Sequence, residues 1–538
     1  MTAVATYDVV VLGSGIAGLA AAVAAHEKRL RPIVLEKAPL IGGGTTNSYG
    51  LIWVGDNHLA RQAGYADSRA EILDYMHFLA GGEAEEANLL AFVDEGPRIL
   101  KFFADCGIPF RLCRGVADHY YGVAPGAKQE GRSLEVELIS GYELGEWRNR
   151  VRIPANAPCY ITCEEQVGWG GMNCFSRWDK DIVRERKAKD MRGKGLGLAC
   201  QFLKAALTRG IAIETGIEVE RLIYDGRRVT GVALADGREI ASRRGVVLAT
   251  GGYESNPELV RDFEGLPNWL SQVPASITGD GLKLATEIGA AVRLIRNNMQ
   301  LFLAFPVPSA SAEPQFQLAG IIELCSPHTV VVNRAGERFA DEAYFQGMIP
   351  ALRAFDPATH SYRNLPCYLV FDQAYADTYS FAGREAGLEI PAWVARDGTI
   401  AGLAAQLGIG AAGLERTVGR FNGFARAGKD EDFRRGELAW RLAQDPSLPA
   451  GKNQALGTLE KPPFYGLELR PSAGSSAGVL TNERGQVIHQ RRQPIPGLYA
   501  SGNTAARIEF GSGYQAGLTL ASGMTFSTLA VEDMISRN

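Results

Sequence analysis

Three glycines near the start of the chain have the spacing of a phosphate-binding turn. Gly13, Gly15 and Gly18 form a GxGxxG motif, and Glu36 follows some twenty residues later. Glycines at this spacing let the backbone approach a pyrophosphate at a helix N-terminus, and an acid at this distance accepts hydrogen bonds from ribose hydroxyls. The motif therefore predicts a bound dinucleotide whose adenosine ribose carries no phosphate.

The elements around the motif must hold these glycines between a strand and a helix. Residues 7–12 form an apolar run typical of a strand, residues 13–30 are rich in Ala and Gly and predict a helix, and residues 31–37 predict a second strand. Strand, tight turn, helix and strand together make the first unit of a dinucleotide fold. This context disfavours a glycine-rich turn that binds no ligand.

Two further glycine segments favour a flavin over a nicotinamide. The cluster Gly42–Thr46 comes directly after Glu36, where a two-domain flavoprotein brings a loop over the pyrophosphate and the ring. The segment Ala249–Gly252 fits a strand that returns to the cofactor.

The remaining pattern is that of a mixed α/β chain. We expect helices within 66–105, 195–210, 281–291, 411–427 and 518–534, strands joined by turns over 211–252, a strand at 497–500, and largely irregular structure over 107–190. Residues from about 276 to 460 lack the glycine fingerprint and are interpreted as an inserted domain.

Size and composition restrict the class of protein. The 538 residues predict two or three domains, and 46% hydrophobic with 22% charged residues is typical of a soluble globular protein. A net charge of −4 gives no reason to expect a nucleic-acid partner. We find no signal peptide, no transmembrane run and no cysteine spacing that suits a metal. We therefore expect a cytoplasmic protein without a metal site.

Motifs in chain order resemble the succinate dehydrogenase/fumarate reductase flavoprotein superfamily. They are Glu36–Gly44, Ala249–Gly252, Thr278–Gly281, Asn333–Phe339 and Pro496–Gly502. The resemblance implies an α/β fold. A split Rossmann-like FAD-binding domain would comprise 1–275 and 461–538, and an inserted α+β substrate-capping domain 276–460. The respiratory members carry a flavin-linked histidine near the second glycine cluster. This chain has none there, so we expect non-covalent FAD.

The motifs and the resemblance together assign the cofactor contacts. The expected residues are Gly13, Gly15, Ile16, Ala17, Gly18, Glu36, Lys37, Gly43, Gly44, Thr45, Thr46, Ala249, Thr250, Gly251, Asp280, Gly502, Asn503, Gly517, Leu518 and Leu520.

Within the superfamily, the turn Gly511–Gly517 favours one branch. Dicarboxylate enzymes carry an arginine in this turn, whereas this chain has Tyr514. Residues 43–54 and 119–135 are similar to segments of the 3-ketosteroid dehydrogenases (Δ1/Δ4). The Tyr514–Gly517 spacing is closer to that of the Δ4 enzymes, although Ala516 replaces a serine of their motif.

This resemblance implies catalytic residues for the desaturation of a ketone. Tyr514 and the Gly517 N–H fall at the carbonyl-binding positions, Tyr344 at that of a base, and Tyr121 or Tyr120 at that of an assisting group. Two hydrogen-bond donors on the carbonyl oxygen stabilise the developing enolate. A second tyrosine can take the α-proton if its pKa falls well below ~10, and the β-hydrogen leaves as hydride to flavin.

Several points stay open at this level. The substrate is a 3-ketosteroid or a smaller cyclohexanone-type ketone, with Arg507 and Trp53 as candidate substrate contacts. The electron acceptor, the oligomeric state and the role of residues 164–179 are not specified. One alternative is an FAD-dependent reductase of an enoic acid, which predicts arginines at the substrate face of the flavin. Another is a flavin-binding scaffold or sensor without catalysis.

Overall fold

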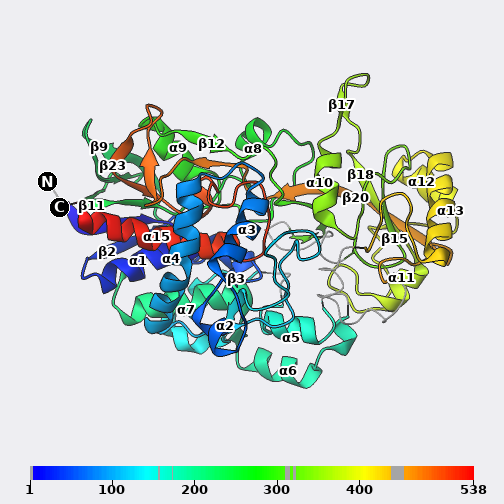
Figure 1. The fold of residues 1–538 in the computed structure, drawn as a ribbon, viewed down its shortest axis with the longest axis horizontal. Coiled ribbons are helices and arrows are strands. Elements are labelled where there is room, and N and C mark those ends of the chain that lie inside the picture. The colour runs from blue at the N-terminus through cyan, green and yellow to red at the C-terminus, as the bar shows by residue number, and fades with distance from the viewer. Residues whose placement is uncertain are drawn as a thin grey trace.

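Two β-sheets organise the chain, one in each lobe of an elongated molecule (Figure 1). The computed structural model describes residues 4–154, 158–171, 174–308, 315–318, 323–437 and 453–537. Within these residues the first lobe holds an eight-stranded sheet and the second a six-stranded sheet. The predicted fold class, a Rossmann-like sheet with an inserted second domain, is confirmed.

The first sheet is built around parallel strands that end at one edge. Its order is β22-β23-β11-β1-β2-β8; in addition, β10 pairs with β11, and β9 pairs with β10. The strands β23, β11, β1, β2 and β8 run parallel, so the turns after β1, β11 and β23 meet at the same edge. The bounds are β1 (Ala5–Leu12), β2 (Pro32–Glu36), β8 (Ala212–Thr215), β9 (Val219–Tyr224), β10 (Val229–Leu234), β11 (Glu239–Leu248), β22 (Gln486–Ile488) and β23 (Pro494–Ala500).

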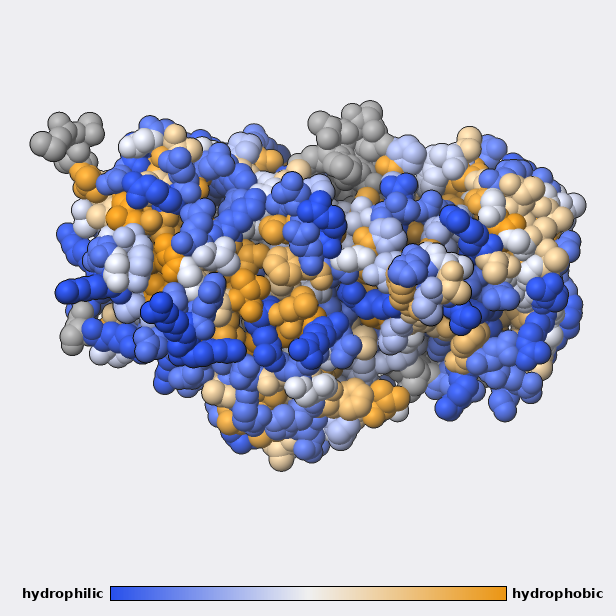
Figure 2. Space-filling model, turned by 90° about the horizontal axis from the view of Figure 1, so that it is seen from above, coloured by the Kyte–Doolittle hydropathy of each residue, from blue (hydrophilic) through white to orange (hydrophobic). Residues whose placement is uncertain are grey.

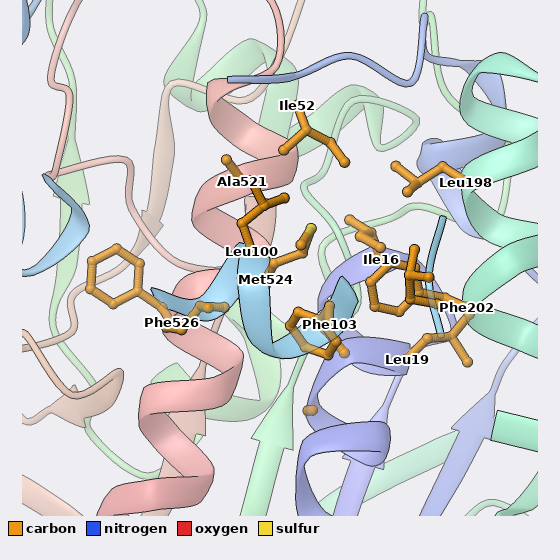
Figure 3. Packing of buried hydrophobic residues seen from close by; sticks show 14 of the residues in the cluster. Ile16, Leu19, Ile52, Leu100, Phe103, Leu198, Phe202, Ala521, Met524 and Phe526 are labelled. Atoms are coloured by element: carbon orange, nitrogen blue, oxygen red, sulfur yellow. The ribbon is translucent and has the colours of Figure 1, made fainter. Parts of the chain in front are cut away.

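Four helices form the main core with this sheet. They are α1 (Ile16–Glu27), α4 (Glu86–Asp105), α7 (Lys194–Thr208) and α15 (Leu518–Ser536). Helix α1 is buried from Ile16 to Ala25, which explains why its sequence is apolar on all sides. Figure 3 shows Leu19 of α1, Phe103 of α4, Phe202 of α7 and Met524 of α15 packed in this core. The core fixes the N-termini of α1 and α15 relative to each other.

Shorter elements complete the first lobe. The helices are α2 (His58–Gln62), α3 (Arg69–Ala80), α5 (Cys163–Gly168), α6 (Lys180–Ala188), α8 (Pro257–Phe263) and α9 (Asp280–Glu287), with 3-10 turns η1 (Gly43–Asn47), η2 (Gly141–Arg150), η3 (Phe175–Arg177) and η5 (Gly502–Thr504). The strands are β3 (Ile52–Trp53), β4 (Phe110–Leu112), β5 (Ser133–Val136), β6 (Ile139–Ser140), β7 (Met191–Arg192), β12 (Val292–Leu294) and β21 (Ala477–Val479). The segment expected to be irregular, 107–190, thus contains α5 and α6.

The second sheet is antiparallel and has its own core. Its order is β14-β13-β20-β18-β15, with β19 paired to β20. The bounds are β13 (Leu301–Val307), β14 (Gln315–Leu318), β15 (Thr329–Asn333), β18 (Cys367–Asp372), β19 (Ala395–Asp397) and β20 (Phe464–Ala473). The accompanying elements are α10 (Phe345–Leu352), β16 (Phe355–Asp356), β17 (Ser361–Tyr362), α11 (Gln373–Thr378), α12 (Ile400–Leu407) and α13 (Ala411–Ala427). Phe305, Leu369 and Phe371 are buried in this core.

The chain passes between the lobes at two neighbouring points. Strand β20 follows residue 460 but pairs with β13 and β18, whereas α9 packs in the core of the first sheet. At the crossing, Asn298 Nδ2 donates to Gly474 O (2.8 Å) and to Ser476 Oγ (2.9 Å). We therefore propose lobe boundaries near residues 295–300 and 474–476, instead of the expected 275 and 460.

The surface is mixed in character. Figure 2, which looks down on the upper face of Figure 1, shows hydrophilic residues spread over both lobes with separate apolar patches among them. Within the described part of the chain, we find no helix with the length and apolar character needed to cross a bilayer.

Candidate active site

One elongated cavity connects the edge of the first sheet with the N-terminus of α15. At one end it is lined by the turn after β1, the Gly43–Thr45 segment and the Ala249–Gly252 segment. At the other end it is lined by Gln300 and Phe302 of the second lobe and by residues 514–517. The two ends differ in chemistry, the first being mainly backbone and the second mainly aromatic.

The first end has the geometry that a pyrophosphate requires. Helix α1 begins with Gly15 as N-cap, a residue without a side chain that could cap the first turn. Gly13 has φ of 101°, and a Cβ there would lie 2.3 Å from Ala249 O, so only glycine fits. The Ile16 N–H donates to Thr45 Oγ1 (2.9 Å), which fixes the second glycine cluster against the helix. A helix N-terminus without a side-chain cap attracts an anion.

Acidic and basic side chains flank this end. Glu36 Oε2 accepts from the Ser14 N–H (2.9 Å) and hydroxyl (2.6 Å), and Glu36 Oε1 accepts from the Ala38 N–H (2.8 Å). These bonds hold the carboxylate at the cavity wall, and its remaining lone pairs can accept from ribose hydroxyls. Lys37 Nζ contacts Asp280 Oδ2 at 3.0 Å. The residues present therefore fit a dinucleotide.

Most of the expected cofactor residues line the cavity. The residues that do so are Gly13, Gly15, Ile16, Ala17, Glu36, Lys37, Gly43, Gly44, Thr45, Ala249, Thr250, Gly251, Asp280, Gly502, Asn503, Gly517 and Leu520. Gly18, Thr46 and Leu518 do not. Gly18 packs against the Gly13 backbone, Thr46 Oγ1 donates to Gly43 O (3.1 Å), and the Leu518 side chain is buried in the core.

Three of the predicted tyrosines lie close together, with Tyr514 lining the second end and Tyr120 and Tyr344 behind it. The Tyr514 ring lies edge-on to Phe302, with centroids 5.2 Å apart. The Tyr514 N–H donates to the Tyr120 hydroxyl (3.4 Å), and the Tyr120 ring lies edge-on to Tyr344 at 6.3 Å. Tyr344 comes from the second lobe, immediately before α10, so the cluster spans both lobes.

Burial keeps these phenols protonated. It raises the pKa of Tyr120 to about 12 and raises the pKa values of Tyr514 and Tyr344 well above their usual range. Neighbouring Tyr120 and Asp341 raise the pKa of Tyr344 further because they disfavour a second negative charge. Hydroxyl groups in this state are hydrogen-bond donors.

Gly517 places the start of α15 against the cavity. It is the N-cap of α15 with φ of 96°, and no side chain caps this helix end. A Cβ there would lie 2.6 Å from the Trp53 N atom, so glycine is required. The Trp53 N–H donates to Gly517 O (3.3 Å), which holds the turn in place.

A polar network that the sequence reasoning missed supports Tyr514. Gln515 Oε1 accepts from the Tyr75 hydroxyl (2.6 Å) and from the His119 N–H (2.7 Å). The His119 ring lies edge-on to Tyr514 at 4.9 Å, and its Nδ1 is 3.1 Å from Gln346 Nε2 of the second lobe. Burial lowers the pKa of His119 to about 4, so the imidazole is neutral at pH 7.

Tyr49 is a further cavity residue, and it is not among the site residues expected from the sequence. It lines the cavity, and burial raises its pKa to about 12. Lys194 Nζ lies 5.3 Å from its ring centroid and also donates to Gln166 Oε1. Tyr49 packs in the same small apolar cluster as Ala516. Its position beside the second glycine cluster was a usable signal.

Five of the expected catalytic and substrate residues are not among those that line the cavity. Tyr120 and Tyr344 pack behind Tyr514, as described above, and the other three lie elsewhere. Tyr121 is 37% exposed and lies on the surface. Trp53 is buried, its Nε1 donates to Asp118 Oδ1 (2.7 Å), and its ring faces the Arg132 guanidinium. Arg507 is buried at the lobe crossing, where it donates to Asn298 Oδ1 (2.8 Å) and Ser475 O (3.1 Å). The structure places these three residues in a surface loop and in two buried networks, and the roles expected of them stay predictions.

Residues 8–520 match a family model described as an FAD binding domain. The chain belongs to this family. The FAD-binding family accounts for the first end of the cavity, whereas the second end distinguishes its branches.

Relatives within the FAD-binding family resemble the whole chain. One is the 4-oxocyclohexanecarboxylate 2-dehydrogenase of Sinomonas cyclohexanicum, 35% identical over 98% of this chain and 92% of the relative. Another is the 3-oxosteroid 1-dehydrogenase of Mycobacterium tuberculosis, 32% identical over 97% of each chain. These names confirm the predicted resemblance to the ketosteroid-dehydrogenase branch.

A solved structure is similar over its full length. It is the 3-ketosteroid Δ1-dehydrogenase of Sterolibacterium denitrificans in complex with 1,4-androstadiene-3,17-dione. Its TM-score is 0.89 at 28% identity, and the match covers 99% of this chain and 100% of that chain. The Tyr514–Gly517 spacing, which is closer to that of the Δ4 enzymes, is therefore compatible with the overall fold of a Δ1 enzyme.

Proposed function

We propose that this protein is an FAD-dependent dehydrogenase that introduces a C=C bond next to the carbonyl of a cyclic ketone. The observation that carries the proposal is the juxtaposition of Tyr514 and the N-terminus of α15, with Tyr120 and Tyr344 behind them. The full-length similarity to two ketone dehydrogenases supports it.

We propose that FAD is held without a covalent bond. Gly13, Gly15, Glu36 and Thr45 would hold its dinucleotide part, and the described lining residues include no histidine or cysteine that could form a link. Bound FAD supplies the acceptor for the hydride that leaves the β-carbon.

Tyr514 and Gly517 would bind the carbonyl oxygen. The buried phenol of Tyr514 stays protonated and can donate, and the α15 N-terminus favours the negative charge that develops on oxygen. Donors fixed in a water-poor site stabilise an enolate more than the starting ketone, which lowers the barrier.

Tyr344 would accept the α-proton. Burial raises the pKa of Tyr344, whereas we expected from the sequence a base with a pKa well below ~10. Its phenolate is therefore a strong base but a rare species at neutral pH. Tyr120, whose ring touches that of Tyr344, would pass the proton on. The proton transfer is then expected to limit the rate at low pH.

The shape of the cavity favours a small ring. Tyr49 occupies wall space beside Ala516, and Lys194 and Gln166 hold its ring there. A large side chain at this position shortens the space for the substrate. We therefore propose a single-ring cyclohexanone as the preferred substrate over a steroid.

The charge of the lining argues against an enoic-acid reductase. That alternative needs arginines at the substrate end, and the described lining residues include none. Lys37 is the cation present in this set, and it pairs with Asp280 at the dinucleotide end. An uncharged carbonyl fits this environment better than a carboxylate pair.

The test is anaerobic mixing of the purified yellow protein with cyclic ketones. We expect 4-oxocyclohexanecarboxylate to bleach the flavin absorbance within one turnover, and 4-androstene-3,17-dione to do so more slowly. Tyr514→Phe should lower the bleaching rate roughly 10²- to 10³-fold, since one carbonyl donor is lost.

Leu388→Ser is the matched control, because Leu388 is 50% exposed and lies outside the cavity. Bleaching by no ketone, together with reoxidation of the reduced protein by an enoic acid, would overturn the proposal.

A further inference from the structure

A second, larger groove lies between the lobes beside the flavin cavity. Its volume is about 1080 Å³. The loop 264–275 and α8 of the first lobe form one side, and the β16–β17 hairpin of the second lobe forms the other. The proposed desaturation does not use this space.

The groove shares a wall with the flavin cavity. Asn47, Glu254 and Val273 line both spaces. Asn47 Nδ2 donates to Gln272 O (3.3 Å), which ties the second glycine cluster to the groove loop. A molecule in the groove is thus separated from the cofactor site by single side chains.

The groove is aromatic, and two of its polar groups are already engaged. Trp269 Nε1 donates to Glu254 O (3.1 Å), and the Tyr362 hydroxyl donates to Gly265 O (2.7 Å). Phe355 is 52% exposed and lies edge-on to His360 and Tyr362, at 5.7 and 5.6 Å. Aromatic walls of this kind favour a planar, largely apolar ligand.

Glu254 supplies a polar group at the shared wall. It is 2% exposed, and its Oε1 accepts from the Ser475 N–H (3.0 Å). Its Oε2 has no hydrogen-bond partner among the described residues. Burial raises the pKa of this carboxyl, so it can hold a proton next to the groove.

We propose that this groove binds the electron acceptor, and that the acceptor is a quinone. The inference rests on the proposed function, because the desaturation releases two electrons and two protons from the ketone. The quinone takes up two electrons and two protons and becomes a hydroquinone. The two electrons and one proton would come from reduced FAD, and the Glu254 carboxyl can donate the second proton and regain it from solvent, to which the α-proton of the ketone is released. Over the two half-reactions, the two electrons and two protons lost by the ketone equal those gained by the quinone.

The test measures binding of menadione to the oxidised holoenzyme by isothermal titration calorimetry. We expect one site per chain. Ser361→Trp, which fills the groove, and Phe355→Ser, which removes an exposed ring, should each weaken binding about tenfold. Leu388→Ser removes an exposed apolar residue outside both spaces and should not change it.

The outcomes separate this inference from the proposed function. Absence of menadione binding, equal binding in all variants, or competition between menadione and the ketone in the oxidised enzyme would each overturn the groove assignment. Anaerobic bleaching by the ketone is measured on the same wild-type preparation. A failure there would overturn the proposed function while the calorimetry still reports on the groove.

Discussion

The two ends of the main cavity differ in how they are built. The dinucleotide end consists of backbone from short segments with strict glycine positions, and it lies within one lobe. The tyrosine end depends on phenols from four distant segments: Tyr49 and Tyr514 line it, and Tyr120 and, from the second lobe, Tyr344 pack behind Tyr514. In the proposed function, the first end binds a charged group with the main chain, and the second carries out chemistry with side chains.

This difference separates affinity from rate. Changes at the dinucleotide end should act on cofactor retention, since a Cβ at Gly13 would collide with Ala249 O. Changes at the tyrosine end should act on the reaction while the cofactor stays bound.

The largest effect is expected for Gly13→Ala. The added Cβ meets Ala249 O at 2.3 Å in a backbone conformation that Ala disfavours. The protein should be purified without flavin. The measurement is its absorbance at about 450 nm, where oxidised flavin absorbs. Tyr514→Phe is the comparison and should keep its flavin. A yellow, stoichiometrically loaded Gly13→Ala protein would contradict the proposed cradle.

Next in size is the effect of Tyr344→Phe. Loss of the base should slow flavin bleaching by the ketone roughly 10²- to 10⁴-fold. In the wild type, the raised pKa of Tyr344 means that the phenolate fraction increases with pH throughout the working range. The bleaching rate should therefore rise about tenfold per pH unit and reach no plateau below about pH 10.

A wild-type rate that is independent of pH between about 7 and 9.5 would remove the base role from Tyr344. In Tyr344→Phe, the residual bleaching rate should not rise with pH.

Tyr49→Ser sharpens the comparison because it changes shape without touching the carbonyl donors. Opening the wall beside Ala516 should raise kcat/KM for 4-androstene-3,17-dione relative to 4-oxocyclohexanecarboxylate by about tenfold. Steady-state assays with an artificial dye acceptor measure this ratio. An unchanged ratio would mean that Tyr49 does not limit substrate size.

The smallest effect is expected for Tyr121→Phe, because Tyr121 is on the surface. Its bleaching rate should stay within about twofold of the wild type, as for most surface changes. Tyr120→Phe removes the hydroxyl that accepts from the Tyr514 N–H. It should slow bleaching roughly 10²-fold, the lower end of the range for a proton-transfer group. If Tyr121→Phe slowed bleaching more than Tyr120→Phe, the assisting role would belong to Tyr121 instead of Tyr120.

The sequence predicted the dinucleotide end well because its determinants are local. Gly13 and Glu36 lie in one strand–helix–strand unit, so spacing alone reports their geometry. The tyrosine end was only partly predictable. Resemblance located Tyr514 and Tyr344, but adjacent Tyr120 and Tyr121 could not be separated, since a loop without periodicity does not indicate which side chain is buried.

Arg507 and Trp53 show a second limit. Their types suggested substrate contacts, yet both are held in buried networks of residues that are distant in the sequence. Trp53 bonds to Asp118, tens of positions away, and Arg507 bonds to Asn298, about two hundred positions away. Tyr49 and His119 were missed for the same reason. Their environments depend on Lys194, Gln166 and Gln346, which no local pattern connects to them.

The two adjacent crossings between the lobes have a consequence for how such enzymes diversify. Because the second lobe leaves near residue 300 and returns near residue 474, its ends are held close by Asn298 and Gly474. A gene segment for this lobe could be exchanged between homologues without interrupting the first sheet. The resulting chimera would inherit Tyr344 and one side of the acceptor groove from the donor. It would keep the carbonyl-binding turn and the ring-size wall of the recipient.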